Sequence, residues 1–280
     1  MDGRAGFRFY GAENIIKKEL RRNPTPMLYV TYGNLFELQS DMEKADKQYD
    51  KAIQSVSKRR SEVTQLAHAF IRATKYDLAV KVFEKGGDLL KDDKVFALNL
   101  GDLYKRKGDT KNMIKYYLIA VENIPEQAES IKGRLSRELS TEGMDTLQQA
   151  LYEKIQETPD IIEFPEMLLW VFTQQKEYKR ALRQAKALDL RLDEDGGRVF
   201  NIANIAATFI IIFRIPDCLN NPTKKPNEKS AGTVNIPKIA MIIAPEMGLD
   251  ELAAVIAKKY TNPQGKSPFK IPKKKKLPKL

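Results

Sequence analysis

Reactive side chains are scarce in this sequence of 280 residues, which holds one cysteine, one histidine and one tryptophan. A single thiol, Cys218, cannot form an internal disulfide, and His68 has no second histidine or cysteine at metal-ligand spacing. A glycine-rich phosphate loop, an HExxH pair and a CxxC pair are also missing. Because most catalytic sites need a nucleophile, a base or a metal in such a setting, we predict no enzyme, no cofactor and no small-molecule substrate.

Long apolar runs are missing as well. The longest, residues 206–213 with Thr208 inside it, is far shorter than the roughly 20 residues that cross a bilayer. Residues 1–20 contain four basic side chains and no apolar stretch of the kind that marks a secretory leader. The expected location is therefore cytoplasmic, unless the chain is a fragment of a longer array.

Net charge is concentrated at one end of the chain. The total is +11, but residues 207–280 hold 14 Lys and Arg against 5 Asp and Glu, so the rest of the chain is nearly neutral. The same segment contains nine of the 14 prolines and ends near the run Lys273–Lys276. This composition predicts a poorly ordered basic tail.

A repeat with a period of about 34 residues runs through the remainder, and its columns keep residue type as well as hydrophobicity. Proline follows the third and fourth units at Pro125 and Pro159. The four clearest columns hold, in order, a small residue, an aromatic, a second small residue, and tyrosine or phenylalanine: Gly33, Ala67 and Gly101; Phe36, Phe70, Tyr104 and Phe172; Ala45, Ala79 and Ala181; Tyr49, Phe83 and Tyr117.

These columns resemble the tetratricopeptide repeat, whose pattern is W-x2-L-G-x2-Y, then A-x3-F, then P, over about 34 residues. The clearest copy reads Leu100-Gly101-Asp102-Leu103-Tyr104 and continues through Met113, Tyr117 and Ala120 to Pro125. The resemblance covers about residues 26–206. It implies an all-α fold, a right-handed α-solenoid of antiparallel helix hairpins, and an ordinary helical bundle has no reason to keep so regular a period.

The chemistry of the columns agrees with paired helices. Small residues are expected where two helices cross closely, and aromatics are expected to fill the space between hairpins, which makes Tyr104 a core residue. Gly108 is suited to end a first helix in the left-handed conformation. Pro125 and Pro159 should stop the second helix of one repeat and start the next unit.

The domain limits follow from where the pattern fails. Residues 1–25 are predicted to be a partial repeat, its second helix only, running from Ala12 to Arg22 with Ile15, Ile16 and Leu20 inside. Residues 26–206 form about five repeats, the fourth degenerate, and the start of a sixth with Val199, Ile202 and Ala203 in its columns. Residues 207–280 are a Pro/Lys-rich tail with one plausible helix, Leu249–Tyr260. The tail is either a disordered arm or the product of truncation or a frameshift.

In this family the first helices line a concave groove that binds a partner. The columns place polar side chains there that are expected to be free for a ligand, with Trp170 as an anchor. The candidate binding residues are Asn34, Gln65, His68, Arg72, Asn99, Asp102, Lys105 and Trp170, with Glu37, Arg106 and Gln174 on the same faces.

The resemblance implies a non-catalytic scaffold that binds a protein or peptide in the groove. Some relatives clamp a C-terminal carboxylate with paired Lys, Asn and Arg. Here only Asn34 fits, while Val30, Gln65, Val95 and Asn99 occupy the other columns, which argues against that clamp. The alternative function is an adaptor that contacts nucleic acid or an acidic membrane through the basic tail.

Overall fold

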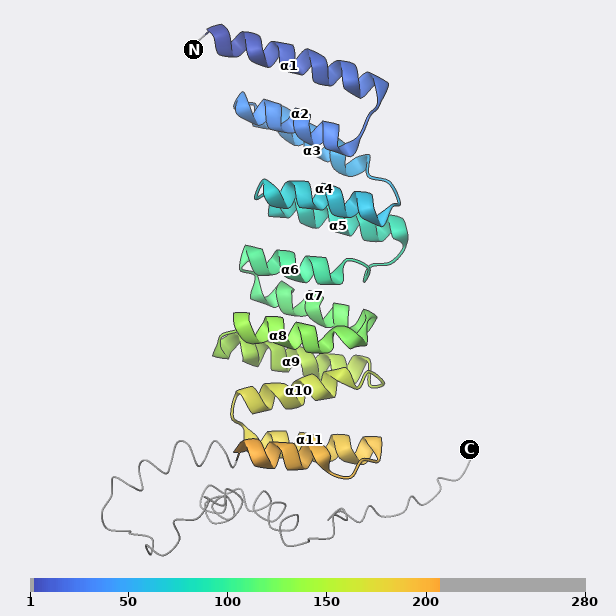
Figure 1. Ribbon diagram of the computed structural model, residues 1–280, viewed down its shortest axis with the longest axis vertical. Coiled ribbons are helices and arrows are strands. Elements are labelled where there is room, and N and C mark those ends of the chain that lie inside the picture. The colour runs from blue at the N-terminus through green and yellow to red at the C-terminus, as the bar shows by residue number, and fades with distance from the viewer. Residues whose placement is uncertain (1–2, 207–280) are drawn as a thin grey trace, which may run out of the picture. The chain divides into compact units, whose positions relative to one another are not determined.

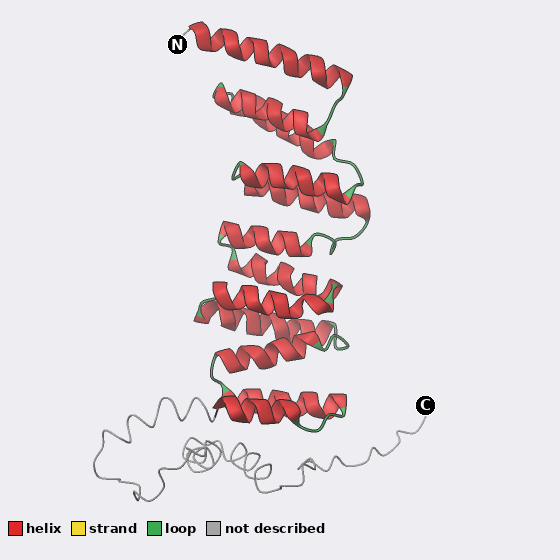
Figure 2. Ribbon diagram, in the orientation of Figure 1, coloured by secondary structure: helices red, strands yellow, loops and turns green. Residues whose placement is uncertain are grey.

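The computed structural model describes residues 3–206, with side chains from residue 10 onward, and this part of the chain is helical throughout, without a strand (Figure 2). The predictions for residues 207–280, including Leu249–Tyr260, lie outside the described residues. The helices are α1 (Gly3–Arg22), α2 (Pro26–Leu38), α3 (Met42–Gln54), α4 (Arg60–Arg72), α5 (Tyr76–Leu90), α6 (Ala97–Lys107), α7 (Thr110–Asn123), the 3-10 turn η1 (Pro125–Gln127), α8 (Ala128–Glu138), α9 (Thr141–Glu157), α10 (Glu163–Gln174), α11 (Tyr178–Leu192) and a helical stretch over 197–206.

Helix starts follow the predicted period. The second helices α3, α5 and α7 begin at Met42, Tyr76 and Thr110, each exactly one period after the last, and α11 begins at Tyr178, two periods beyond Thr110. This confirms the fold class as an all-α helical repeat. The handedness of the stack stays a prediction.

The described part of the chain divides into two compact units, one ending at residue 143 and one beginning at residue 144, so the division falls inside α9. In the first unit α2 packs on α3, α4 on α5 and α6 on α7, and the hairpins follow one another in chain order (Figure 1). Helix α2 also contacts α4, and α3 contacts α5. First helices therefore lie beside first helices in these two repeats, and second helices beside second helices.

Glycine marks the crossing points, as the columns predict. A Cβ built on Gly33 would lie 2.3 Å from Cε1 of Tyr49, and one built on Gly101 would lie 2.4 Å from Cδ1 of Tyr117. Both rings are fully buried against the glycine backbone. In the second repeat Ala67 takes the glycine column and Phe83 takes the tyrosine column, and both are fully buried.

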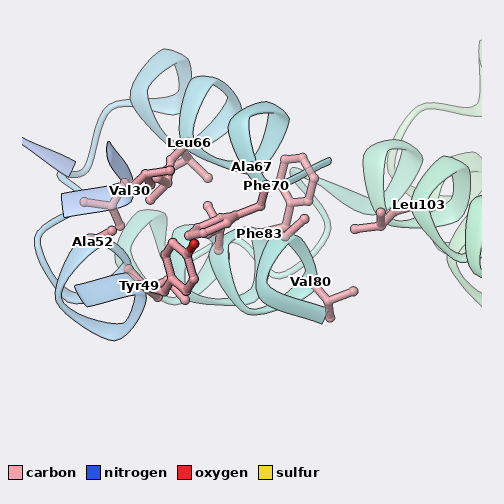
Figure 3. Close-up of a cluster of buried hydrophobic side chains, with 14 of the residues drawn as sticks. Val30, Tyr49, Ala52, Leu66, Ala67, Phe70, Val80, Phe83 and Leu103 are labelled. Atoms are coloured by element: carbon pink, nitrogen blue, oxygen red, sulfur yellow. The ribbon is translucent and has the colours of Figure 1, made fainter. Parts of the chain in front are cut away.

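Aromatic side chains connect neighbouring hairpins in the core of the first unit (Figure 3). The Tyr49 and Phe70 rings meet edge to face with centroids 5.5 Å apart, and Phe83 lies 5.2 Å from Phe96. Tyr104 departs from the expectation of a buried core aromatic. It is half-buried, packs against the core cluster and stacks on Tyr116 with centroids 5.3 Å apart.

Capping residues fix the ends of the helices. The carboxylates of Asp41 and Asp109, two periods apart, accept hydrogen bonds from the third backbone N–H of α3 and α7, at 3.1 and 3.0 Å. Gly108 ends α6 with φ of 72°, the left-handed conformation expected for it. Pro125 starts η1 directly after α7, as predicted.

Helix α1 is longer than the sequence suggested. It begins at Gly3 instead of Ala12, because no proline interrupts residues 3–22 and the glycines there are tolerated at a modest cost. Ile16 and Leu20 pack on the core as expected, but Ile15 does not, since 71% of it is exposed on the side turned away from α2.

The second unit repeats the pattern on its own. Helix α10 packs on α11 around Phe164, Met167 and Leu182. Val199, Ile202 and Ala203 are buried in the helical stretch 197–206, where the sixth repeat was expected to start. Buried Asp189 accepts a hydrogen bond from the backbone N–H of Val199 at 3.3 Å.

Candidate functional site

The exposed side of α2, α4 and α6 carries seven of the eight predicted binding residues, and we call it the first-helix face. The opposite side of each helix packs into the core through residues such as Leu35, Leu66 and Leu100. Steps of three and four residues keep the polar side chains on one side of a helix. The face comprises Asn34, Gln65, His68, Arg72, Asn99, Asp102 and Lys105.

Two positions of this face hydrogen-bond to the second helix of their own repeat. The Tyr49 hydroxyl donates to Asn34 Oδ1 at 2.7 Å, and the Tyr117 hydroxyl donates to Asp102 Oδ1 at 2.7 Å. In the repeat between them Phe83 replaces the tyrosine, so His68 receives no such bond. The ring of each tyrosine thus packs on a glycine of the first helix, and its hydroxyl donates a hydrogen bond to the residue directly after that glycine.

Asp102 and Lys105 also link one repeat to the next. Arg134 of α8 donates to Asp102 Oδ1 at 2.5 Å, and Lys105 Nζ lies 2.6 Å from Glu138 Oε1. These two side chains are not free, which corrects the expectation that the whole polar face of α6 is available. The two ion pairs stabilise the interface between α6 and α8, which belong to neighbouring repeats.

Titration behaviour follows these contacts. Burial, together with the hydrogen bond to Asp102, raises the pKa of the Tyr117 hydroxyl above its ordinary range. The Arg134 guanidinium loses solvent through burial, but the carboxylate of Asp102 outweighs this loss, so the pKa of Arg134 is raised. The Tyr117 hydroxyl therefore stays protonated and the Arg134 guanidinium stays charged at physiological pH.

Four residues of the face have no side-chain hydrogen bond or ion pair within residues 10–206. Gln65, His68 and Arg72 are exposed on α4, and Asn99 is half-exposed on α6. His68 has no neighbouring ligand, since the described part of the chain contains no group of three His, Cys, Asp or Glu side chains that could hold a metal ion.

Trp170 belongs to the second unit, apart from the other candidates, and is described on its own. It is half-buried on α10, a helix in which Leu168 and Phe172 are buried, while Gln174, one turn further along, is exposed. Part of its indole is therefore accessible, as an anchor requires.

Sequence reasoning missed the ion pairs between repeats. Glu37 of α2 pairs with Lys75, and Asp77 pairs with Lys107. Opposite charges separated by about one period were a visible signal, but pairing depends on how the hairpins stack. The exposed Leu38 and Met27 on α2 were also missed, because apolar residues of a helical pattern are ordinarily assigned to the core.

Among residues 3–206, no helix combines the length and the apolar character that crossing a membrane requires. No curated protein matches the sequence. A family model described as tetratricopeptide repeat matches residues 96–127, which correspond to α6, α7 and η1. Repeats of this family generally mediate protein–protein interaction and are typically non-catalytic. Residues 96–127 are therefore a tetratricopeptide repeat, and the same hairpin recurs at its period on either side of the matched unit.

Proposed function

We propose that this chain is a non-catalytic scaffold that binds a partner protein or peptide along the first-helix face. The observation that carries the proposal is the set of accessible polar side chains without an internal partner, Gln65, His68 and Asn99, on helices whose other sides are used for packing. Side chains that do not hold the fold together are the ones that a ligand can use.

The energetics favour such a surface. The Tyr49 and Tyr117 side chains are fully buried, and a buried hydroxyl that loses its partner costs about 1–3 kcal/mol. Asn34 and Asp102 are therefore engaged as the acceptors of these two hydroxyls. Gln65 and Asn99 carry no such constraint and have both donors and acceptors for a peptide backbone. In the second unit, Trp170 supplies an accessible aromatic of the type that dominates interfaces.

The experiment begins with capture of a partner by the full chain, followed by measurement of affinity and melting temperature on variants. His68→Ala and Asn99→Ala should each weaken binding by about 1–2 kcal/mol, the range of an interface contact, and leave the melting temperature nearly unchanged. Trp170→Ala tests the second unit in the same way.

Lys51→Gln and Lys85→Gln are matched controls. Both residues are exposed on second helices, one period apart, and form no ion pair within residues 10–206. If these two variants lose the partner while His68→Ala and Asn99→Ala keep it, the first-helix face is not the binding surface.

A second candidate, an adaptor that contacts nucleic acid or acidic membrane, is favoured by the net charge of +9 in residues 207–280. Replacing Lys273–Lys276 with glutamine in the full chain separates the two. Binding that depends on these lysines and falls steeply with salt supports the adaptor, whereas binding that survives supports the scaffold.

A further inference from the structure

Every acidic side chain on the three first helices is already neutralised by a neighbour. Glu37 pairs with Lys75, Glu62 lies 3.6 Å from the Arg59 guanidinium, and Asp102 binds Arg134 at 2.5 Å. The negative charge of α2, α4 and α6 is therefore taken up by internal ion pairs.

Not all of the basic side chains are compensated. Lys105 and Lys107 pair with Glu138 and Asp77, and Arg60 donates to the carbonyl of Val95 at 3.3 Å. Arg72 and Arg106 are exposed, and their side chains form no hydrogen bond or ion pair in the described part of the chain. They lie one period apart, so they occupy the same position in successive repeats.

The equivalent position in the preceding repeat is Leu38, which is 71% exposed. Each of the three residues lies in the last turn of its helix, α2, α4 or α6. This column, Leu38–Arg72–Arg106, thus presents one apolar side chain followed by two free guanidinium groups. A single exposed leucine is ordinary on a protein surface, but in the same column as two unpaired guanidinium groups it offers an apolar contact to a ligand that those groups bind.

We propose that this column selects an acidic peptide, with carboxylates that meet Arg72 and Arg106 and an apolar side chain that covers Leu38. The inference rests on the proposed function and specifies its ligand. A guanidinium binds a carboxylate through two parallel hydrogen bonds, which gives direction as well as charge. Two free cations would release few counterions from a nucleic-acid backbone, and counterion release drives most of the affinity for nucleic acid.

A purely structural role for the arginines makes a different prediction. A cation in the last turn of a helix is stabilised by the helix dipole, and it stabilises the helix in return. Under that role Arg72→Gln and Arg106→Gln would lower the melting temperature slightly and leave ligand binding unchanged, and Leu38 would have no part in it.

The test is selection of a random peptide library, displayed on phage, against the full chain carrying glutamine at positions 273–276, so that the lysine run attracts nothing. Selected peptides are then synthesised and titrated against Arg72→Gln, Arg106→Gln and Leu38→Ser. Lys51→Gln and Lys85→Gln, also one period apart but on second helices, remove the same charge as matched controls.

We expect peptides enriched in Asp and Glu, with affinity reduced about five- to tenfold by each arginine substitution and unchanged in the lysine controls. Neutral or basic peptides whose binding is lost in His68→Ala would overturn the acidic ligand and leave the proposed function standing. Failure to select any peptide, or binding insensitive to every first-helix substitution, would overturn both. A short single-stranded DNA that binds the chain but not the double arginine variant would replace the peptide with nucleic acid.

Discussion

Replacing Gly101 with alanine should destabilise the protein although alanine is the better helix former. The added Cβ would lie 2.4 Å from Cδ1 and 2.6 Å from Cε1 of Tyr117. That ring is fully buried, and its hydroxyl is fixed by Asp102, so it has no space to move into. Overpacking of this kind costs about 1–3 kcal/mol, against about 1 kcal/mol gained in helix propensity.

The contacts are close enough to place the cost in the upper part of that range, so the net loss should be about 1–2 kcal/mol. Gly133→Ala, in the middle of α8, is the matched control, because a Cβ there meets nothing within 4 Å. It should stabilise the chain by about 0.5–1 kcal/mol. One substitution thus has opposite signs at two positions of the first unit.

The assay is urea unfolding of the full chain followed by far-ultraviolet circular dichroism, with the transition midpoints compared. Repeat arrays unfold with neighbour-dependent cooperativity, so the sign of each shift is more informative than an extrapolated free energy. If Gly101→Ala and Gly133→Ala raise the midpoint equally, the Tyr117 ring does not pack on Gly101, and the crossing geometry of the repeat is wrong.

Three further predictions concern the same helices. Tyr117→Phe removes the hydroxyl that donates to Asp102, while the ion pair between Asp102 and Arg134 remains. Because the Asp102–Arg134 pair is partly solvated, the free energy of unfolding should fall by only about 1 kcal/mol in the same urea assay. The backbone N–H of Asn112 lowers the pKa of Asp109 in the folded chain. The stability that the Asp109 carboxylate adds to the fold is therefore complete above its unfolded pKa of about 4 and is lost as pH falls through the lower folded pKa. Asp109→Asn should keep most of the cap, and its melting temperature should change less between pH 5 and pH 2 than that of the parent. Phe70→Ala should cost about 3–5 kcal/mol, and Tyr104→Ala, half-buried, clearly less; equal losses in thermal melts would mean that Tyr104 is a core residue after all.

Much of the fold could be predicted because every repeat has the same packing requirement at its helix crossing. Gly33 and Gly101 are small because a ring crosses them, and that requirement leaves a mark in sequence at a fixed interval. Helix α6 is the exception. Its start is delayed to Ala97, because α5 ends in the left-handed Lys91 and a turn follows in which Asp92 accepts a hydrogen bond from the backbone N–H of Lys94.

The position of the candidate site residues on their helices could be predicted, but whether each side chain is free or already hydrogen-bonded could not. The spacing of the repeat columns predicted that Asn99 and Asp102 lie on one side of α6. It could not distinguish a free side chain from one that forms an ion pair with the next repeat. That distinction depends on Arg134, which lies on a helix of the degenerate repeat. Tyr104 was expected to be a buried core aromatic from its column, but it is half-buried, packs against the core cluster and stacks on Tyr116.

Site-specific photo-crosslinking tests the central claim most directly. A benzoylphenylalanine is placed at His68 on the first-helix face and, in a second variant, at Lys85 on the second helix of the same repeat, both exposed. The full chain is irradiated with the captured partner or a selected peptide, and the products are mapped by mass spectrometry. We expect a cross-link from position 68 and none from position 85; a cross-link from position 85 alone would contradict binding at the first-helix face.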